Sequence, residues 1–481
     1  MTTSWLNKEQ FLSQLQENDT GSQQSAPCPS DYAEGQSYWI QEYAIEFEDQ
    51  CRTAGLPGEV DVVVIGTGIS AAACLYAIAN QKPELRIAVV EARGICTGAT
   101  GRNGGHICRA EGTDLRALVE EVGQEEAIRL SRLGTHNRDL MLEAVEKIEA
   151  ADQVDLNLTG TRVVFASDQE RQTYLAELDY AQKLGISLEG RFIAAEQLSK
   201  DCNVCPEKAK YGAAAIDKSG TIYPRKLVAA LLRDATKRIP NLTIHPYNPV
   251  RSVSKSDTSG SKPSYIVKTD KGLIKCLAVV HATNAYASYL IPSLKGPQGV
   301  LGCKAECIAI SPNISASGVD SAPPGLRGGL GFDEFWHYLI QRPNNGPFIY
   351  GWAGIEKVGD YDDSDTLPKG DDGSPAGHSV MGEFLESAFP QSFKSIKWDQ
   401  HVSHRWTGIQ GFTQTGASLV GRHSKESPGE FISVGHNGEG MGRCFASSTV
   451  MTDRLLYYLD GKDESSWSPP DWFPRSFLYN I

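Results

Sequence analysis

The sequence lacks any long apolar run. No segment approaches the roughly 20 apolar residues that cross a bilayer, so we expect no membrane span. The first residues, MTTSWLNKEQFLSQLQEN, lack the basic start and apolar stretch of a secretory signal. The final FLYNI is neither a peroxisomal nor an ER-retention signal. These absences predict a cytoplasmic protein with no membrane partner.

Positive charge is also scarce. Lys and Arg number 46 against 59 Asp and Glu, which gives a net charge of −13 and argues against nucleic acid as a partner. The 11 cysteines are odd in number and scattered, as expected for reduced thiols. Cys202 and Cys205 form a lone C-x-x-C, and Cys303 and Cys307 a C-x-x-x-C. A zinc site needs four ligands. No second pair with suitable spacing accompanies either motif, so we predict no metal site.

The amino-acid composition of the chain changes near residue 60. Residues 1–59 are polar, rich in Gln and Ser, and predicted to be an N-terminal extension. Within it, residues 37–51 (SYWIQEYAIEFEDQC) favour one amphipathic helix lying on the body of the protein. The length of 481 residues then suggests two domains, and no internal repeat is visible.

The first chemical motif follows a predicted buried strand at residues 60–65 (VDVVVI). Gly66-Thr-Gly68-Ile-Ser-Ala71 fits G-x-G-x-x-[GA], in which the glycines allow a tight turn and close approach to a pyrophosphate, and Ala71 allows close helix–strand packing. A helix at 69–80, a second strand at 86–90 and the acid Glu91 follow in order. A glycine-rich turn of another α/β fold is the alternative, but this order favours a dinucleotide site.

Two glycine-rich segments favour FAD over NAD. Residues 92–106 (ARGICTGATGRNGGH) contain five glycines, which suits a backbone pressed against an extended ligand. Residues 435–442 (GHNGEGMG) lie between a predicted strand and a helix expected from Cys444 to Leu459. That helix N-terminus would stabilise negative charge on a reduced flavin. A simple strand-to-helix turn is the alternative, although it would not need so many glycines.

On these motifs the chain resembles a known family of FAD-dependent oxidoreductases, which includes D-amino-acid oxidase, glycine and sarcosine oxidases and γ-glutamylputrescine oxidoreductase. Further stretches that carry the resemblance are residues 214–231 (AAIDKSGTIYPRKLVAAL), 278–286 (AVVHATNAY) and 404–422 (HRWTGIQGFTQTGASLVGR). The stretch TGATGRNGGH (97–106) is similar to the putrescine-type branch and to fungal homologues with an SYW-containing extension.

The resemblance implies an α/β fold, with a Rossmann-type FAD-binding domain interleaved with a β-rich α+β substrate domain. We expect the FAD-binding domain at residues 60–150, 212–295 and 404–465, and the substrate domain at 151–211 and 296–403, with its sheet in 299–354.

The resemblance also implies a set of FAD contacts. The expected cofactor-binding residues are Gly66, Gly68, Ile69, Ser70, Ala71, Glu91, Ala92, Arg93, Gly98, Ala99, Thr100, Arg102, Asn103, Gly104, Gly105, His106, Val250, Ala282, Thr283, Asn284, Gly408, Gly438, Gly440, Met441 and Gly442.

Six residues are candidates for the catalytic region. They are His106, Arg109, Trp336, Tyr338, Arg405 and Glu439. His106 is expected over the isoalloxazine, or else as a loop histidine bonded to backbone; Arg109 is a carboxylate clamp or a surface arginine. Trp336 and Tyr338 are expected on one face of a strand, as part of an aromatic cage for an amine or as core packing. By the resemblance, Arg405 lies beside the flavin. Glu439 lies inside the C-terminal glycine turn and would anchor an ammonium group.

By the resemblance, the chain is an FAD-dependent oxidoreductase that oxidises a small amine or amino acid at a CH–NH bond by hydride transfer to flavin N5. Oxygen or another acceptor would take the electrons. Oxidation of a C–C or C–O bond of a secondary metabolite, and flavin binding without turnover, remain alternatives.

The chain also departs from the family pattern. No cysteine lies near Arg405 and Trp406, where sarcosine oxidases attach their flavin, so non-covalent FAD is expected. The lysine that helps oxygen react in those enzymes would fall near Ile349, where it is absent. The basic residue that clamps the substrate carboxylate would fall near Gly442, and Arg443 only partly compensates for it. These changes argue against glycine, sarcosine and simple D-amino acids as substrates and leave the acceptor open.

Overall fold

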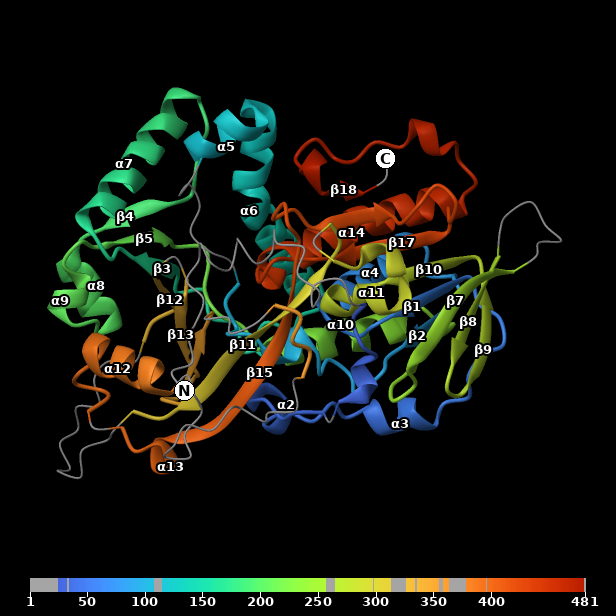
Figure 1. Cartoon of the computed structure of the whole chain (residues 1–481), viewed down its shortest axis with the longest axis horizontal. Coiled ribbons are helices and arrows are strands. Elements are labelled where there is room, and N and C mark those ends of the chain that lie inside the picture. The colour runs from blue at the N-terminus through green and yellow to red at the C-terminus, as the bar shows by residue number, and fades with distance from the viewer. Residues whose placement is uncertain are drawn as a thin grey trace.

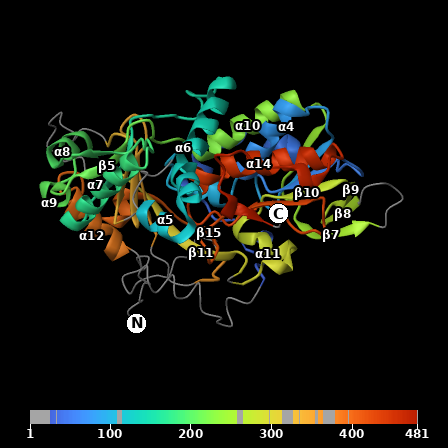
Figure 2. The same ribbon diagram turned by 90° about the horizontal axis from the view of Figure 1, so that it is seen from above.

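The computed structural model describes residues 25–32, 34–107, 115–256, 264–296, 298–312, 326–333, 335–353, 358–362, 378–394 and 396–479. Strands in these ranges form three sheets. Figures 1 and 2 show the largest sheet at one end of the molecule, with α7 (Asp168–Lys183), α8 (Ala195–Cys202), α9 (Pro206–Ala209) and α12 (His378–Ala388), and the three-stranded sheet of residues 250–276 at the other. Among the described residues, none of the helices combines the length and apolar character that a bilayer crossing requires.

The seven-stranded sheet has the order β18-β16-β17-β10-β1-β2-β6. Its strands pair in parallel from β17 to β6, while β16 is antiparallel to β17. The four residues of β1 and of β2 are all buried, as the β-branched runs predict for a central parallel strand. The strands are β1 (Val62–Ile65), β2 (Ile87–Val90), β6 (Leu242–His245), β10 (Ala278–His281), β16 (Leu419–Arg422), β17 (Glu430–Val434) and β18 (Leu478–Tyr479).

Alternate side chains of β1 point to opposite faces of the sheet and belong to two different hydrophobic cores. Val62 and Val64 pack with helices α4 (Ile69–Gln81), α10 (Pro224–Arg238) and α14 (Gly440–Leu459). Val63 and Ile65 pack in a second core with the three-stranded sheet, made of β7 (Val250–Ser256), β8 (Ser264–Thr269) and β9 (Gly272–Cys276). The seven-stranded sheet is therefore covered on both faces.

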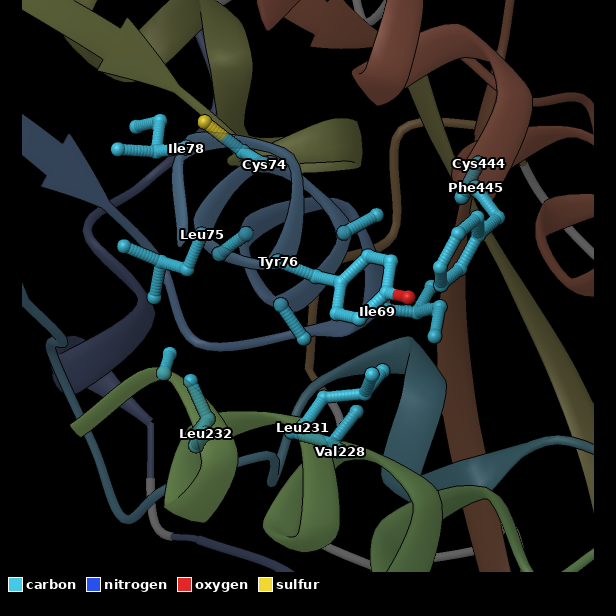
Figure 3. Close-up of a cluster of buried hydrophobic side chains, with 14 of the residues drawn as sticks. Ile69, Cys74, Leu75, Tyr76, Ile78, Val228, Leu231, Leu232, Cys444 and Phe445 are labelled. Atoms are coloured by element: carbon cyan, nitrogen blue, oxygen red, sulfur yellow. The ribbon is translucent and has the colours of Figure 1, made fainter. Parts of the chain in front are cut away.

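Figure 3 shows the helical core. The ring of Tyr76 on α4 points toward Phe445 on α14, with 6.0 Å between the ring centroids, while Leu231 and Leu232 approach from α10. This packing holds the N-terminus of α4 and that of α14 on the same side of the molecule as the cavity described below. The long helix α6 (Gln124–Lys147) packs against α14.

The eight-stranded sheet has the order β15-β11-β14-β13-β12-β3-β5-β4. The strands expected between residues 299 and 354 lie in it. Its members are β3 (Thr161–Val164), β4 (Arg191–Ile193), β5 (Ala213–Ile216), β11 (Leu301–Ile310), β12 (Gly329–Phe332), β13 (His337–Gln341), β14 (Phe348–Trp352) and β15 (Val402–Phe412). Two of these strands, β5 and β15, lie within or partly within ranges that we expected from the sequence in the FAD-binding domain (212–295 and 404–465).

The remaining elements are short or lie at the periphery. They are α2 (Tyr38–Gln41), α3 (Glu48–Thr53), α5 (Leu115–Val122), α7 (Asp168–Lys183), α8 (Ala195–Cys202), α9 (Pro206–Ala209), α11 (Ala287–Leu290), α12 (His378–Ala388) and α13 (Trp398–His401), with 3-10 helices η1 (Pro29–Asp31), η2 (Ala99–Arg102), η3 (Asn284–Tyr286), η4 (Pro292–Leu294), η5 (Glu464–Ser466) and η6 (Arg475–Phe477).

Two helix predictions are wrong in their bounds. The single helix expected over 37–51 is two short ones, α2 and α3. The backbone between them follows the body instead, because the carbonyl of Tyr43 accepts a hydrogen bond of 3.0 Å from the Arg225 side chain. The C-terminal helix begins at Gly440, four residues before the expected Cys444, so glycines form its first turn.

Candidate active site

A cavity of about 1040 Å³ lies where the seven-stranded sheet meets the eight-stranded one. Ile65 and Val90, at the carboxyl ends of β1 and β2, line one side, and residues of β11, β13 and β15 line the other. Ligands of open α/β sheets bind at this edge of the parallel strands. The cavity therefore has the position expected for a dinucleotide.

The first residue of the turn after β1, Gly66, leaves no room for a side chain. Gly66 has φ +108, and a Cβ atom there would lie 2.7 Å from the carbonyl oxygen of Ala282 on the neighbouring strand segment. Gly68 is the N-cap of α4 and lines the cavity. The N-terminus of α4 thus lines the cavity, with the N–H of Ile69 donating to the hydroxyl of Thr100 at 3.1 Å, and a helix N-terminus in this position suits a pyrophosphate.

Glu91 follows β2 at the edge of the cavity. One of its carboxylate oxygens accepts hydrogen bonds from the backbone N–H and the hydroxyl of Thr67, at 3.0 and 2.7 Å. The other accepts from the N–H of Arg93 at 3.1 Å. Burial raises the pKa of Glu91 above its ordinary value, and the hydrogen bonds of Thr67 and Arg93 oppose that rise. The carboxylate is held in place and still lines the cavity.

The loop from Gly98 to Gly105, here called the flavin loop because its sequence predicts that FAD lies against it, is fixed from behind by its own arginine. Arg102 is 2% exposed, and its guanidinium donates to the carbonyls of Thr97 and Thr407, both at 2.8 Å, and to that of Gly35. These bonds tie the loop to β15 and to the N-terminal segment.

Three aromatic residues, here called the aromatic wall, line the same cavity as the flavin loop. They are Phe335, Trp336 and Tyr338. The ring of His106 meets Phe335 and Tyr338 edge-on, with centroid distances of 5.6 and 5.9 Å. Trp336 lies just before β13 and not within it, because that strand begins at His337.

Tyr338 is seated between two glycines. A Cβ atom on Gly351, its partner on β14, would overlap the Tyr338 ring, and one on Gly104 would lie 2.6 Å from it. The Tyr338 hydroxyl lies 3.4 Å from the Sγ of Cys307 on β11. Burial raises the pKa of Cys307 to about 12, so both groups stay protonated at neutral pH.

The turn before α14 also lines the cavity. Glu439 lines the cavity, and its carboxylate pairs with Arg443 at 3.4 Å. His436, 2% exposed, has its Nδ1 3.1 Å from the hydroxyl of Ser418, and burial lowers its pKa to about 4. The imidazole of His436 is therefore neutral at physiological pH.

Most of the expected FAD contacts lie together in this cavity. Ala71 and Gly105 do not line it: Ala71 is fully buried in the helical core, and Gly105 faces Ile340 and Trp39 behind the flavin loop. Among the catalytic candidates, His106, Trp336, Tyr338 and Glu439 line the cavity.

Two catalytic candidates are not placed in the cavity. Arg405 is not among its lining residues, because β15 reaches the cavity only from Gly408 onward. Arg109 lies outside the described residues.

Sequence reasoning missed several lining residues. Thr67 is a variable position of the glycine motif, which carries no signal for its side chain. Cys307 and Gln410 lie on strands whose cavity-facing side depends on the tertiary structure. The cavity also reaches apolar residues of α5, α6 and the C-terminal segment, including Leu118, Leu130 and Phe477, which carry no motif.

The comparisons with known proteins agree with this geometry. Residues 61–454 match the family model described as "DAO: FAD dependent oxidoreductase", and the chain therefore belongs to this family of FAD-dependent oxidoreductases. No curated protein sequence matches the chain.

Solved structures show the same fold at low identity. Glycine oxidase from Bacillus cereus is 18% identical, with a TM-score of 0.62, over 83% of this chain and 97% of its own. L-proline dehydrogenase from P. horikoshii is 19% identical, with a TM-score of 0.65, over 88% and 98%. L-amino acid deaminase from Proteus myxofaciens, solved with anthranilate, is 18% identical, with a TM-score of 0.63, over 89% and 94%.

The residues present fit the FAD that the family requires. The flavin loop turns its glycines Gly98 and Gly104 to the cavity, and a Cβ atom on Gly98 would meet nothing within 4 Å. The hydroxyl of Thr283 also lines the cavity, is buried, and has no hydrogen-bond partner among the described residues. The cradle thus offers free volume, free donors and a helix N-terminus where a large phosphate-bearing ligand needs them.

Proposed function

We propose that this oxidoreductase acts on a small amine or amino-acid-like molecule and oxidises it at a CH–NH bond. The observation that carries the proposal is the aromatic wall of Phe335, Trp336 and Tyr338, which lines the same cavity as the flavin loop and packs against Gly104 of that loop through Tyr338. The names of the solved relatives, which are an oxidase, a dehydrogenase and a deaminase of amino acids, support the same substrate class.

The bound FAD would supply the two-electron acceptor. The protein's own part is to bind and orient the substrate and to exclude water. Aromatic faces attract a cationic amine by about 0.5–2 kcal/mol each. His106, edge-on to Phe335 and Tyr338, is the polar group of this wall that we expect to contact the substrate.

Two further assignments belong to this proposal. We assign the seven- and three-stranded sheets to FAD binding and the eight-stranded sheet to the substrate. We also propose that FAD is held without a covalent bond, because Arg405 and Trp406 occupy the positions where sarcosine oxidases attach it. Yellow colour released into the supernatant after acid precipitation tests this point.

The test of function is anaerobic titration of the purified yellow protein. A panel of primary and secondary amines and amino acids is expected to bleach the flavin absorbance, whereas matched alcohols are not. Bleaching by the alcohols alone would replace the proposal with C–O oxidation. No bleaching by any class, with FAD bound and reducible by dithionite, would leave a flavin-binding protein without turnover. Reoxidation of the bleached protein by air or by an added dye identifies the acceptor.

A further inference from the structure

Three consecutive carbonyl groups of the flavin loop are held from behind by side chains. The carbonyl of Gly101 accepts a hydrogen bond from the hydroxyl of Ser37. The carbonyl of Arg102 accepts from the indole Nε1 of Trp406 at 2.8 Å, and that of Asn103 from the indole Nε1 of Trp39 at 2.6 Å. Both indole rings are fully buried in one hydrophobic cluster and neither lines the cavity.

The planar trans peptide links these carbonyls to the other side of the loop. In such a unit the C=O of one residue and the N–H of the next point in opposite directions, and the described residues contain no cis peptide bond. Trp406 and Trp39 draw the carbonyls of Arg102 and Asn103 away from the cavity. The N–H groups of Asn103 and Gly104, which both line the cavity, are thereby turned toward it. Within the described residues, no hydrogen-bond acceptor is found for either N–H.

Part of this device lies outside the family's shared region. The family match begins at residue 61, whereas Ser37 and Trp39 belong to the N-terminal segment. That segment is locked to the body by further contacts. The hydroxyl of Tyr223 donates to the carbonyl of Trp39 at 3.0 Å, and the Arg342 guanidinium lies 5.1 Å from the Trp39 ring. The N-terminal segment is thus a structural part of the loop's support and is held firmly in place.

We propose that Trp39 and Trp406 are positioning residues, which aim the N–H groups of Asn103 and Gly104 at the FAD and so raise its electron affinity. Preorganised N–H donors stabilise the negative charge that reduction adds to a bound group, and they act most strongly where water is excluded. This inference rests on the FAD that the family requires and not on the identity of the substrate.

The test compares three tryptophan-to-phenylalanine variants, each of which keeps an aromatic ring and removes one indole donor. Trp39→Phe and Trp406→Phe remove the two bonds to the flavin loop. Trp467→Phe is the matched control, since its indole donates to Asp453 at 2.9 Å and does not line the cavity. The midpoint potential of the bound flavin is measured by equilibration with reference dyes, and thermal melting is followed in parallel.

At the wild-type midpoint potential, we expect the oxidised-to-reduced ratio of the flavin to rise from one to about five in Trp39→Phe and in Trp406→Phe, the size of one hydrogen bond. The control should keep a ratio of one even if it melts at a lower temperature. Wild-type potentials in both loop variants, or an equal shift in the control, would overturn the proposal. If Trp39→Phe does not retain flavin, Trp406→Phe decides by the same criterion.

Discussion

The two walls of the cavity differ, because one is lined mainly by backbone groups and the other mainly by side chains. On the side of the seven-stranded sheet the wall is mainly backbone, with Gly66 and Gly68 presenting peptide groups and a helix N-terminus. On the side of the eight-stranded sheet side chains contribute more, among them those of Phe335, Tyr338 and Cys307. A backbone wall suits a ligand common to the family, whereas a wall of side chains can change its specificity without a change of fold.

The largest effect that this comparison predicts is on the backbone wall. Gly66→Ala places a Cβ atom 2.7 Å from the Ala282 carbonyl at a φ of +108, so the turn must shift. We expect FAD affinity to fall by at least about 100-fold, measured as FAD content and as a dissociation constant. Gly58→Ala is the control, because a Cβ atom there meets nothing within 4 Å. Normal FAD binding by Gly66→Ala would contradict the idea of a bare backbone wall.

The next effect concerns the opposite wall. Gly351→Ala overlaps the ring of Tyr338 and must displace it, so substrate affinity should fall by about 10-fold while FAD content stays normal. The control is the same substitution in a Tyr338→Ala background, where it should have little further effect on substrate affinity. An equal loss in both backgrounds would show that the displaced ring is not the cause.

A smaller effect is expected from Tyr338→Phe. It removes the hydroxyl that lies 3.4 Å from the Cys307 sulfur and keeps the ring of the wall. Since this contact is weak, we expect a change of about threefold in KM and none in FAD affinity. Steady-state kinetics with the substrate found by the bleaching panel measures it, and a loss above about 100-fold would mean that the hydroxyl takes part in the reaction.

The smallest effect is on the stability of the protein and depends on pH. Each contains a buried histidine, His436 in the turn before α14 and His337 on β13, and burial lowers both pKa values from 6.5 to about 4. Protons therefore bind only the unfolded chain between those values. The stability contributed by the neutral histidines is complete above pH 6.5 and is lost as the pH falls toward 4, by at most about 1.4 kcal/mol per pH unit for each histidine.

The measurement is the melting temperature from pH 7.5 to 5 for wild type and for His337→Gln. The variant is expected to start lower, because it loses a hydrogen bond of 2.6 Å to Tyr350 and a stacked contact with Phe384. Its melting temperature should then fall less steeply with acid than that of wild type. Parallel pH profiles would mean that His337 is not protonated on unfolding in this range.

The backbone wall was largely predictable from the sequence. The helix expected at 69–80 is α4, and the strand that ends before Glu91 is β2. Local rules suffice there, because a buried parallel strand, a glycine turn and an acid stand in fixed order within about 30 residues. The family match, with FAD as cofactor, confirms the conclusion drawn from that order.

The side-chain wall was less predictable, because its geometry depends on contacts between distant residues. Tyr338 owes its position to Gly351 on the next strand, and Trp39 reaches a loop more than 60 residues further along the chain. The bounds of α2 and α3 failed for the same reason: Arg225, far away in the sequence, binds the backbone between them. Helical periodicity carries no information on such partners.

The cavity draws its lining from nearly the whole chain, from Cys28 and Pro29 near one end to Phe477 near the other. A ligand bound there contacts segments that separate when the protein unfolds, so the unfolded chain has no binding site for it. By mass action the melting temperature should then climb with the logarithm of free FAD once FAD exceeds its dissociation constant. Cellular flavin supply would in this way govern how long the polypeptide survives, quite apart from how fast it turns over.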